Sequence, residues 1–226
     1  MWRLLFYSWA VIYSFKFLVK KKWMWDSKAS WANNESYKLT SEEFVHYVME
    51  LAFYGSLLFF QFFDIKRKDF WAMCIHHNVT ILIMVSAYIH KITRLGSFCL
   101  MVLDMADVIL EAGKIANYLH WRKACNGIFW VFAIVFLVSR LVLFPLRCAS
   151  SLFQDSQEVL GRIGRWEYYI IILVVLQVLH LYWCILVVQM IYKTLRKGEV
   201  YRDVRSDDDD DDDGTMEEES EILRDK

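Results

Sequence analysis

The sequence predicts an all-α fold, a polytopic integral membrane bundle of about six transmembrane helices. Apolar side chains make up 57% of the 226 residues, and the chain has only 8 Gly and 1 Pro. These apolar residues gather in stretches of about 20, the length at which a helix crosses the hydrocarbon core of a bilayer. Buried helices of a soluble protein are the less favoured interpretation, because such helices keep one polar face and these stretches mostly do not.

Six apolar stretches follow one another along the chain, most of them bounded by charged residues. The first ends at three lysines and has no small-residue cleavage site, so it is predicted to be a span and not a signal peptide. Lys and Arg are spread evenly between the two sets of loops, so the positive-inside rule does not orient the bundle. The expected spans are Trp2–Val19, Phe44–Phe63, Phe70–Ile89, Leu95–Tyr118, Gly127–Leu146 and Tyr168–Tyr192.

The charge divides the chain into a membrane domain, residues 1–200, and an acidic tail, residues 201–226. The first part carries 22 Lys and Arg against 14 Asp and Glu, whereas the second carries 4 against 13. The run Asp207–Asp213 repels itself and cannot pack, so the tail is predicted to be disordered and solvated. Ser206, directly before this run, is a candidate phosphorylation site.

Two kinds of modification are expected from the remaining motifs. Asn34 begins an Asn-x-Ser sequon and is a candidate glycosylation site if its loop is lumenal, whereas the sequon at Asn78 lies inside a span. The cysteines have no paired spacing, so we expect small packing residues and neither disulfides nor zinc ligands. They are Cys74, Cys99, Cys125, Cys148 and Cys184.

Ionisable residues inside the apolar stretches are the candidates for function, because a charge at membrane depth is costly. The third stretch holds the pair His76 and His77. Four charged residues of the fourth stretch fall within about 80° of one helix face. They are Asp104, Asp107, Glu111 and Lys114. We expect the imidazoles and this acidic stripe to face each other across two neighbouring helices.

An imidazole held by a carboxylate has two relevant uses. It can act as a general base toward an amine or hydroxyl, or attack a thioester and carry the acyl group as an acyl-imidazole. Two other interpretations stay open, a structural polar network and a metal site. The metal is disfavoured because adjacent histidines diverge by about 100° on a helix.

Other polar residues within the stretches are predicted to serve packing. His46 has Glu50 four residues on, and His180 has Gln177 three residues before it, so both histidines are expected to be hydrogen-bonded bundle residues. Arg140 lies deep within the fifth expected span, where its charge needs a partner. Glu50 and a substrate phosphate are the two candidates.

Several motifs together identify a family. The segment 64–118 contains Lys-Arg-Lys-Asp-Phe at 66–70, the His76–His77 pair, Asp104-x-x-Asp107 and Leu-Glu-Ala at 110–112. It closely resembles the signature region of the ceramide synthases, the longevity-assurance proteins of the TLC-domain superfamily. The resemblance extends to MELAFY at 49–54, SRLVLFP at 139–145 and DVRSDDD at 203–209.

The resemblance implies a multi-pass enzyme of the endoplasmic reticulum membrane that transfers a fatty acyl group from acyl-CoA to the amine of a sphingoid base. His76 and His77 would be the catalytic pair, working through an acyl-histidine, with Asp104 and Asp107 as acidic partners. Acyl-CoA is expected as a co-substrate, without a cofactor or metal. Substrate-binding roles would fall to Lys66, Arg67, Lys68, Arg94, Glu111 and Lys114.

The resemblance also implies topology and partners. A cytosolic C-terminus would place the basic loop 66–68 on the CoA side, and the loop Pro145–Glu167 would tune acyl-chain length. The expected partners are fatty acyl-CoA, a sphingoid base, the lipid bilayer and a second ceramide synthase in a homo- or heterodimer, with no nucleic acid.

Two departures from the family pattern support a second interpretation. Leu103 stands where the family has a histidine before Asp104, and the chain begins where family members have already passed a first span, so an N-terminally short form is expected. The second interpretation is a non-catalytic TLC-domain protein, either a regulatory partner of full-length ceramide synthases or a lipid sensor. A lipid transporter is a weaker third, because internal repeats and broken helices are not apparent.

Overall fold

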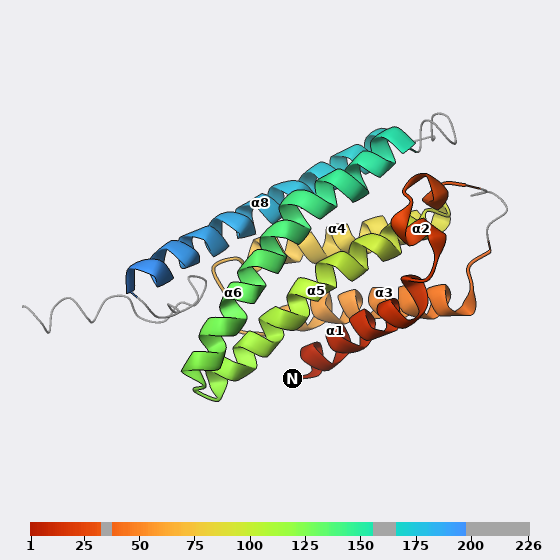
Figure 1. The fold of residues 1–226 in the computed structure, drawn as a ribbon. Helices are drawn as coiled ribbons and strands as arrows, with labels where there is room; N and C mark the ends of the chain where they lie inside the picture. Colours follow the sequence, from red (N-terminus) through yellow and green to blue (C-terminus); the bar gives the residue numbers. More distant parts are fainter. Residues whose placement is uncertain (33–37, 156–165, 198–226) are drawn as a thin grey trace, which may run out of the picture.

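The computed structural model describes residues 1–32, 38–155 and 166–197, and these residues contain helices and no strand, which confirms the all-α membrane fold class (Figure 1). The expected tail, 201–226, lies outside the described residues. The elements are α1 (Trp2–Tyr13), η1 (Ser14–Leu18), α2 (Lys22–Trp25), η2 (Lys28–Ser30), α3 (Ser41–Gln61), α4 (Phe70–Ile89), α5 (Thr93–Tyr118), α6 (Arg122–Val138), η3 (Ser139–Ala149), η4 (Ser151–Asp155) and α8 (Trp166–Lys197).

Each of the six expected spans lies almost entirely in a helix, and the third coincides with α4. The first is formed by α1 and η1 together, and the fifth runs from α6 into η3. Three helical stretches of the described chain are both long and apolar enough to cross a membrane, namely Phe70–Ile89, Arg122–Asp155 and Glu167–Arg196. The chain is thus a multi-pass membrane protein, and the count of six spans stays a prediction.

Helix α5 is the centre of the bundle. It contacts α1, α2, α3, α4, α6 and η3, and Figure 1 shows it lying between α1 and α6. Neighbouring helices therefore cover much of its surface, and this explains how a helix with four charged residues along one stripe is accommodated. Asp104 is fully buried, and Glu111 is 9% exposed.

Two tight turns set the order of the helices around α5. Lys91, after α4, and His120, after α5, both adopt positive φ, 59° and 55°. In each turn the next residue donates its N–H back to the carbonyl five positions earlier, Ile92 to Ala87 at 2.7 Å and Trp121 to Ala116 at 3.0 Å. This is the Schellman pattern that ends helices. Because α4 therefore runs opposite to α5, the first half of α4 lies level with the second half of α5.

Helix α3 begins with a capping box. The Glu43 N–H donates to the Thr40 hydroxyl, and the Thr40 N–H donates to the Glu43 carboxylate at 2.9 Å. The neighbouring Glu42 is exposed to water, and a hydrogen bond from its own backbone, followed by one from Thr40, lowers the pKa of its carboxyl. This capping box fixes where α3 begins, and α3 packs against α4.

The π-helical segment η3 contains Pro145. Proline lacks the N–H that an α-helix needs, and π-widening is a common way for a helix to accommodate such a gap. Along this segment Cys148 meets Cys99 of α5 in a disulfide with a Cα–Cα distance of 6.3 Å. The prediction that all five cysteines are packing residues is therefore wrong for these two. The pairing could not be recognised from the sequence, because the two cysteines are 49 residues apart and only helix packing brings them together.

The disulfide should stabilise the bundle. We expect the Cys99→Ser/Cys148→Ser double variant to unfold at lower temperature, with a loss of roughly 2–4 kcal/mol, because the bond closes a long loop of the unfolded chain. Thermal unfolding in detergent, with and without reductant, measures this change. Cys125→Ser, which removes a thiol outside the bond, is the matched control. Equal melting temperatures for wild type and double variant would contradict the expectation.

Candidate active site

The paired histidines of α4 lie in an aromatic cluster made by three helices. The ring centroids of His76 and His77 are 5.7 Å apart, and Tyr54 of α3 is 6.5 Å and 6.2 Å from them. Trp183 of α8 presents its ring edge-on to His76 at 5.2 Å. The Trp183 N–H donates to Asp69 at 3.3 Å, which anchors this indole to the start of α4. These contacts hold the His76 ring in a defined orientation.

A hydrogen bond from α3 fixes the tautomer of His77. The Gln61 amide nitrogen donates to the Phe70 carbonyl at 2.7 Å, so the amide oxygen is the atom that faces His77 Nδ1, at 2.8 Å. An amide oxygen only accepts, hence His77 carries its proton on Nδ1. Its Nε2 is left with a lone pair. The partner that orients this imidazole is thus an amide and not the carboxylate expected from the sequence.

The acidic stripe of α5 is partly neutralised by two cations. Arg140 of η3 lies 3.5 Å from Asp107, and Lys114 lies 2.5 Å from Glu111. Arg140 also stacks over the Phe136 ring at 3.9 Å and donates to the Ser139 hydroxyl at 3.2 Å. The partner of Arg140 is therefore Asp107, where the sequence had suggested Glu50 or a substrate phosphate.

Arg140 links the acidic stripe to the imidazoles. It lies close enough to act electrostatically on His76 and on His180, while its guanidinium pairs with Asp107. Helices α4 and α5 are in contact as expected. The arrangement therefore brings two imidazoles, a guanidinium and a carboxylate into one region of the bundle.

A second polar chain enters the bundle from α3. The Ser14 hydroxyl bonds His46 at 2.9 Å, and His46 lies 3.6 Å from Glu50. The His46 and Glu50 side chains are fully buried. The expected pairing of His46 with Glu50 is confirmed.

The basic residues expected to bind substrate occupy two different places. Lys66, Arg67 and Lys68 are exposed in the connection from α3 to α4, close to Gln61 and the histidines. Arg94 is buried at the start of α5, where it donates to the carbonyls of Ala29, Ser30 and Ala32. Since α4, about 30 Å long, separates the two places, the structure does not bring Arg94 together with the basic loop.

The prediction from sequence did not assign several of these side chains to the site. Gln61, Tyr54 and Trp183 were not identified, although a lone glutamine inside an apolar stretch was a usable signal. His180 of α8 was expected to be a bundle residue, and it lies 6.4 Å from His76 and 4.8 Å from Phe144, measured between ring centroids. Asn34 and Ser206 fall outside the described residues.

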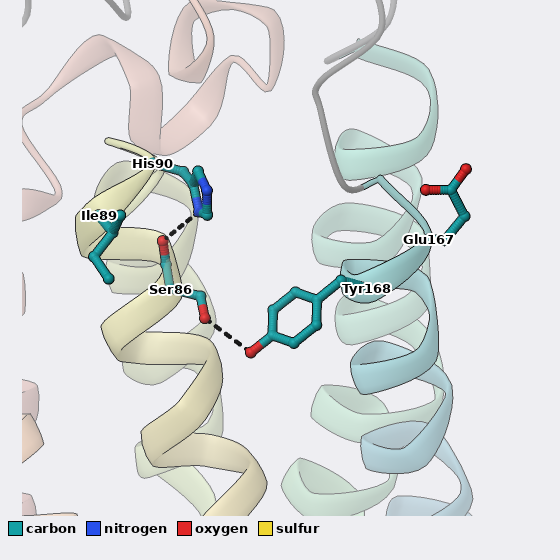
Figure 2. A pocket seen from close by; sticks show the side chains of 5 residues that line it. All are labelled: Ser86, Ile89, His90, Glu167 and Tyr168. Carbon is teal, nitrogen blue, oxygen red and sulfur yellow. Dashed lines mark hydrogen bonds between the residues drawn. The ribbon is translucent and has the colours of Figure 1, made fainter.

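One pocket lies at the other end of α4, on the surface between α4 and α8, with a volume of about 460 Å³. Figure 2 shows the Ser86 hydroxyl bonded to Tyr168, at 2.9 Å, and His90 bonded to the Ser86 backbone, also at 2.9 Å. Ile89 and Glu167 complete the lining. Ser86 follows His76 by ten residues, a rise of about 15 Å along α4, so this pocket is separate from the histidines.

Comparison with known proteins shows which proteins this chain resembles in sequence. The family model for the TLC domain matches residues 1–189. Ceramide synthase 5 of Mus musculus is 39% identical over 207 residues, which cover 92% of this chain and 50% of that protein. Ceramide synthase 4 of Bos taurus is also 39% identical, over 91% of this chain and 52% of that protein.

A more distant relative matches a similar share of the chain. Ceramide synthase hyl-1 of Caenorhabditis elegans is 28% identical over 91% of this chain and 59% of its own length. The chain thus spans about half the length of the curated relatives it matches. All three alignments cover the segments that hold the paired histidines and the acidic stripe, since each includes at least 91% of the chain. The chain belongs to the TLC domain family.

Proposed function

We propose that this protein is a sphingoid base N-acyltransferase that transfers a fatty acyl group from acyl-CoA to the amine of sphinganine or sphingosine. The observation that carries the proposal is the pair of imidazoles, His76 and His77, of which His77 is held as a base by Gln61. The names of the relatives, ceramide synthases over more than nine tenths of this chain, support the same chemistry.

The site offers each group that this reaction requires. One imidazole takes the acyl group as an acyl-histidine, and the other removes a proton from the attacking amine. Arg140, paired with Asp107, supplies positive charge near the imidazoles, where an oxyanion develops during acyl transfer. The exposed basic loop 66–68 suits the phosphates of CoA.

The same proposal includes the cellular setting. The protein acts in the endoplasmic reticulum membrane, alone or as a homo- or heterodimer with another ceramide synthase, with its basic loop on the cytosolic side. The acyl chain extends along α4 from His76 toward the pocket at Ser86 and Tyr168. Glu167, which ends the segment expected to tune chain length and lies in the first turn of α8, lines that pocket, which supports this path.

A direct assay tests the function. The 226-residue chain is expressed in cells that lack endogenous ceramide synthase activity, and the conversion of labelled sphinganine is measured with acyl-CoAs of different lengths. We expect N-acyl product with a preference for one range of lengths. A His76→Ala/His77→Ala double variant at equal expression is the control, and equal product from it would contradict the proposal.

One observation favours a second candidate, a non-catalytic regulatory partner or lipid sensor. Leu103, where the family resemblance gives a histidine, packs against an apolar cluster that contains Phe144 and Leu176, so α5 brings no imidazole to this position. In the same assay, product only upon co-expression with a full-length ceramide synthase would support this second candidate.

Gln61 should affect the rate and not the binding of substrate. We expect Gln61→Leu to lower kcat by about 10- to 100-fold, the range seen when a metal-bound histidine loses its orienting partner, because His77 loses the acceptor for its Nδ1 proton. The KM for acyl-CoA should change little. Steady-state kinetics in reconstituted vesicles measure both constants. The matched control is Ser56→Ala on α3, whose hydroxyl bonds only its own helix at Phe53.

A further inference from the structure

We propose that His180 of α8 is the proton partner of His76, a positioning residue that takes the Nδ1 proton of His76 when that imidazole is acylated and returns it when the amide forms. This inference rests on the proposed N-acyltransferase function and assigns different roles to the two histidines of α4. It begins from a chemical requirement. An imidazole that attacks through one nitrogen becomes a neutral acyl-imidazole only if its other nitrogen gives up its proton.

The two histidines of α4 differ in how they meet this requirement. His77 Nδ1 donates to the neutral amide oxygen of Gln61 at 2.8 Å, and an amide cannot accept the proton itself. His76 Nδ1 is buried and has no hydrogen-bond partner among the described residues. His76 is therefore suited to be acylated, and His77 is suited to be a base whose lone pair faces the amine.

His180 is the basic side chain positioned to serve His76. Its ring centroid is 6.4 Å from that of His76, its side chain is 1% exposed, and its own Nδ1 also has no partner in the described part of the chain. A single water or a small ring rotation closes the remaining gap between the two imidazoles. The edge-to-face contact of Phe144 with His180 at 4.8 Å holds this ring in place.

The steps balance with these residues. The His76 lone pair attacks the thioester carbon, the carbon–sulfur bond breaks, CoA leaves as a thiolate, and His180 takes the proton from His76. The neutral amine then attacks the acyl carbon, the bond to His76 breaks, and His180 returns its proton to His76 while His77 takes a proton from the amine. That last proton neutralises the CoA thiolate, directly or through water.

The test separates proton transfer from packing by chemical rescue. In His180→Ala, reconstituted in lipid nanodiscs as the full chain, we expect the burst of CoA released from acyl-CoA alone to slow by about 100-fold. Millimolar imidazole should restore at least a tenth of the wild-type rate, whereas pyrrole, which fills the same space without a basic nitrogen, should not. Leu176→Ala, another buried residue of α8, is the matched control and should not respond to imidazole.

Several outcomes would overturn the proposal. A burst rate within threefold of wild type, equal restoration by pyrrole, or no restoration by imidazole would each show that His180 acts through packing alone. If His180→Ala does not fold, His180→Phe is the second variant, because it keeps an aromatic ring in contact with Phe144 but has no basic nitrogen. A burst at the wild-type rate in His180→Phe would equally contradict the proposal. A wild type that makes the N-acyl product without a CoA burst would refute only the His180 role, and one that makes no product refutes the proposed function as well.

Discussion

His76→Ala is expected to abolish acyl transfer, with a loss of at least about 1,000-fold in turnover, because it removes the imidazole proposed above as the nucleophile. His77→Ala should reach a similar loss of final product by a different route. The two variants are distinguished with acyl-CoA alone, where His76→Ala releases no burst of CoA and His77→Ala still does. Rapid-quench measurement of CoA and intact-protein mass spectrometry of the acyl adduct provide the two readings.

The control for both histidine variants lies on the same helix. Asn78 is exposed, and its amide donates only within α4, to Cys74, so Asn78→Ala should retain the wild-type burst and turnover. An acyl adduct that forms equally in His76→Ala and wild type would assign the nucleophile to another residue. Full turnover in both histidine variants would remove the basis of the proposed function.

Arg140→Met is expected to cause the largest loss of stability, about 3–5 kcal/mol, because it leaves the Asp107 carboxylate in the bundle without its arginine partner. Both side chains of this pair are largely shielded, with 9% and 19% of their surface exposed. Methionine keeps the length needed to cover the Phe136 ring that Arg140 now stacks on. The melting temperature in detergent should fall clearly.

A double variant separates the charge from the packing. Arg140→Met/Asp107→Leu removes both members of the pair, and we expect most of the lost stability to return, because replacing a buried pair with apolar side chains is often close to neutral. Activity should not return, because the positive charge near the imidazoles stays absent. A double variant less stable than Arg140→Met would show that Asp107 has a separate stabilising role.

Much of the fold was predictable because its signal is local. Apolar stretches of membrane length located all the long helices, and the third expected span coincides with α4. The sequence also marked α5 as the least apolar of them. Its four charged residues are explained by packing, since α5 contacts six other elements and exposes little of its surface to lipid.

The candidate site was only half predictable, because helix rotation decides which side chains meet. Spacing along a helix correctly grouped the carboxylates on α5 and marked the paired histidines on α4. The contacts from Gln61 to His77, from Arg140 to Asp107 and from Cys99 to Cys148 join different helices, and none leaves a spacing pattern in the sequence. His180 was assigned to packing because Gln177 lies three residues before it in the sequence. Its contact with His76 joins two different helices, so nothing in the sequence indicated it.

The Cys99–Cys148 disulfide also reports which way the protein is threaded through its membrane. Such bonds form and persist on the oxidising, lumenal side and are reduced in the cytosol. Cys99 lies near the start of α5, the end of the bundle opposite the basic loop 66–68. Protein isolated from cells with this bond intact would therefore have its Cys99 end facing the lumen and its basic loop 66–68 facing the cytosol, an assignment that the even distribution of lysine and arginine could not provide.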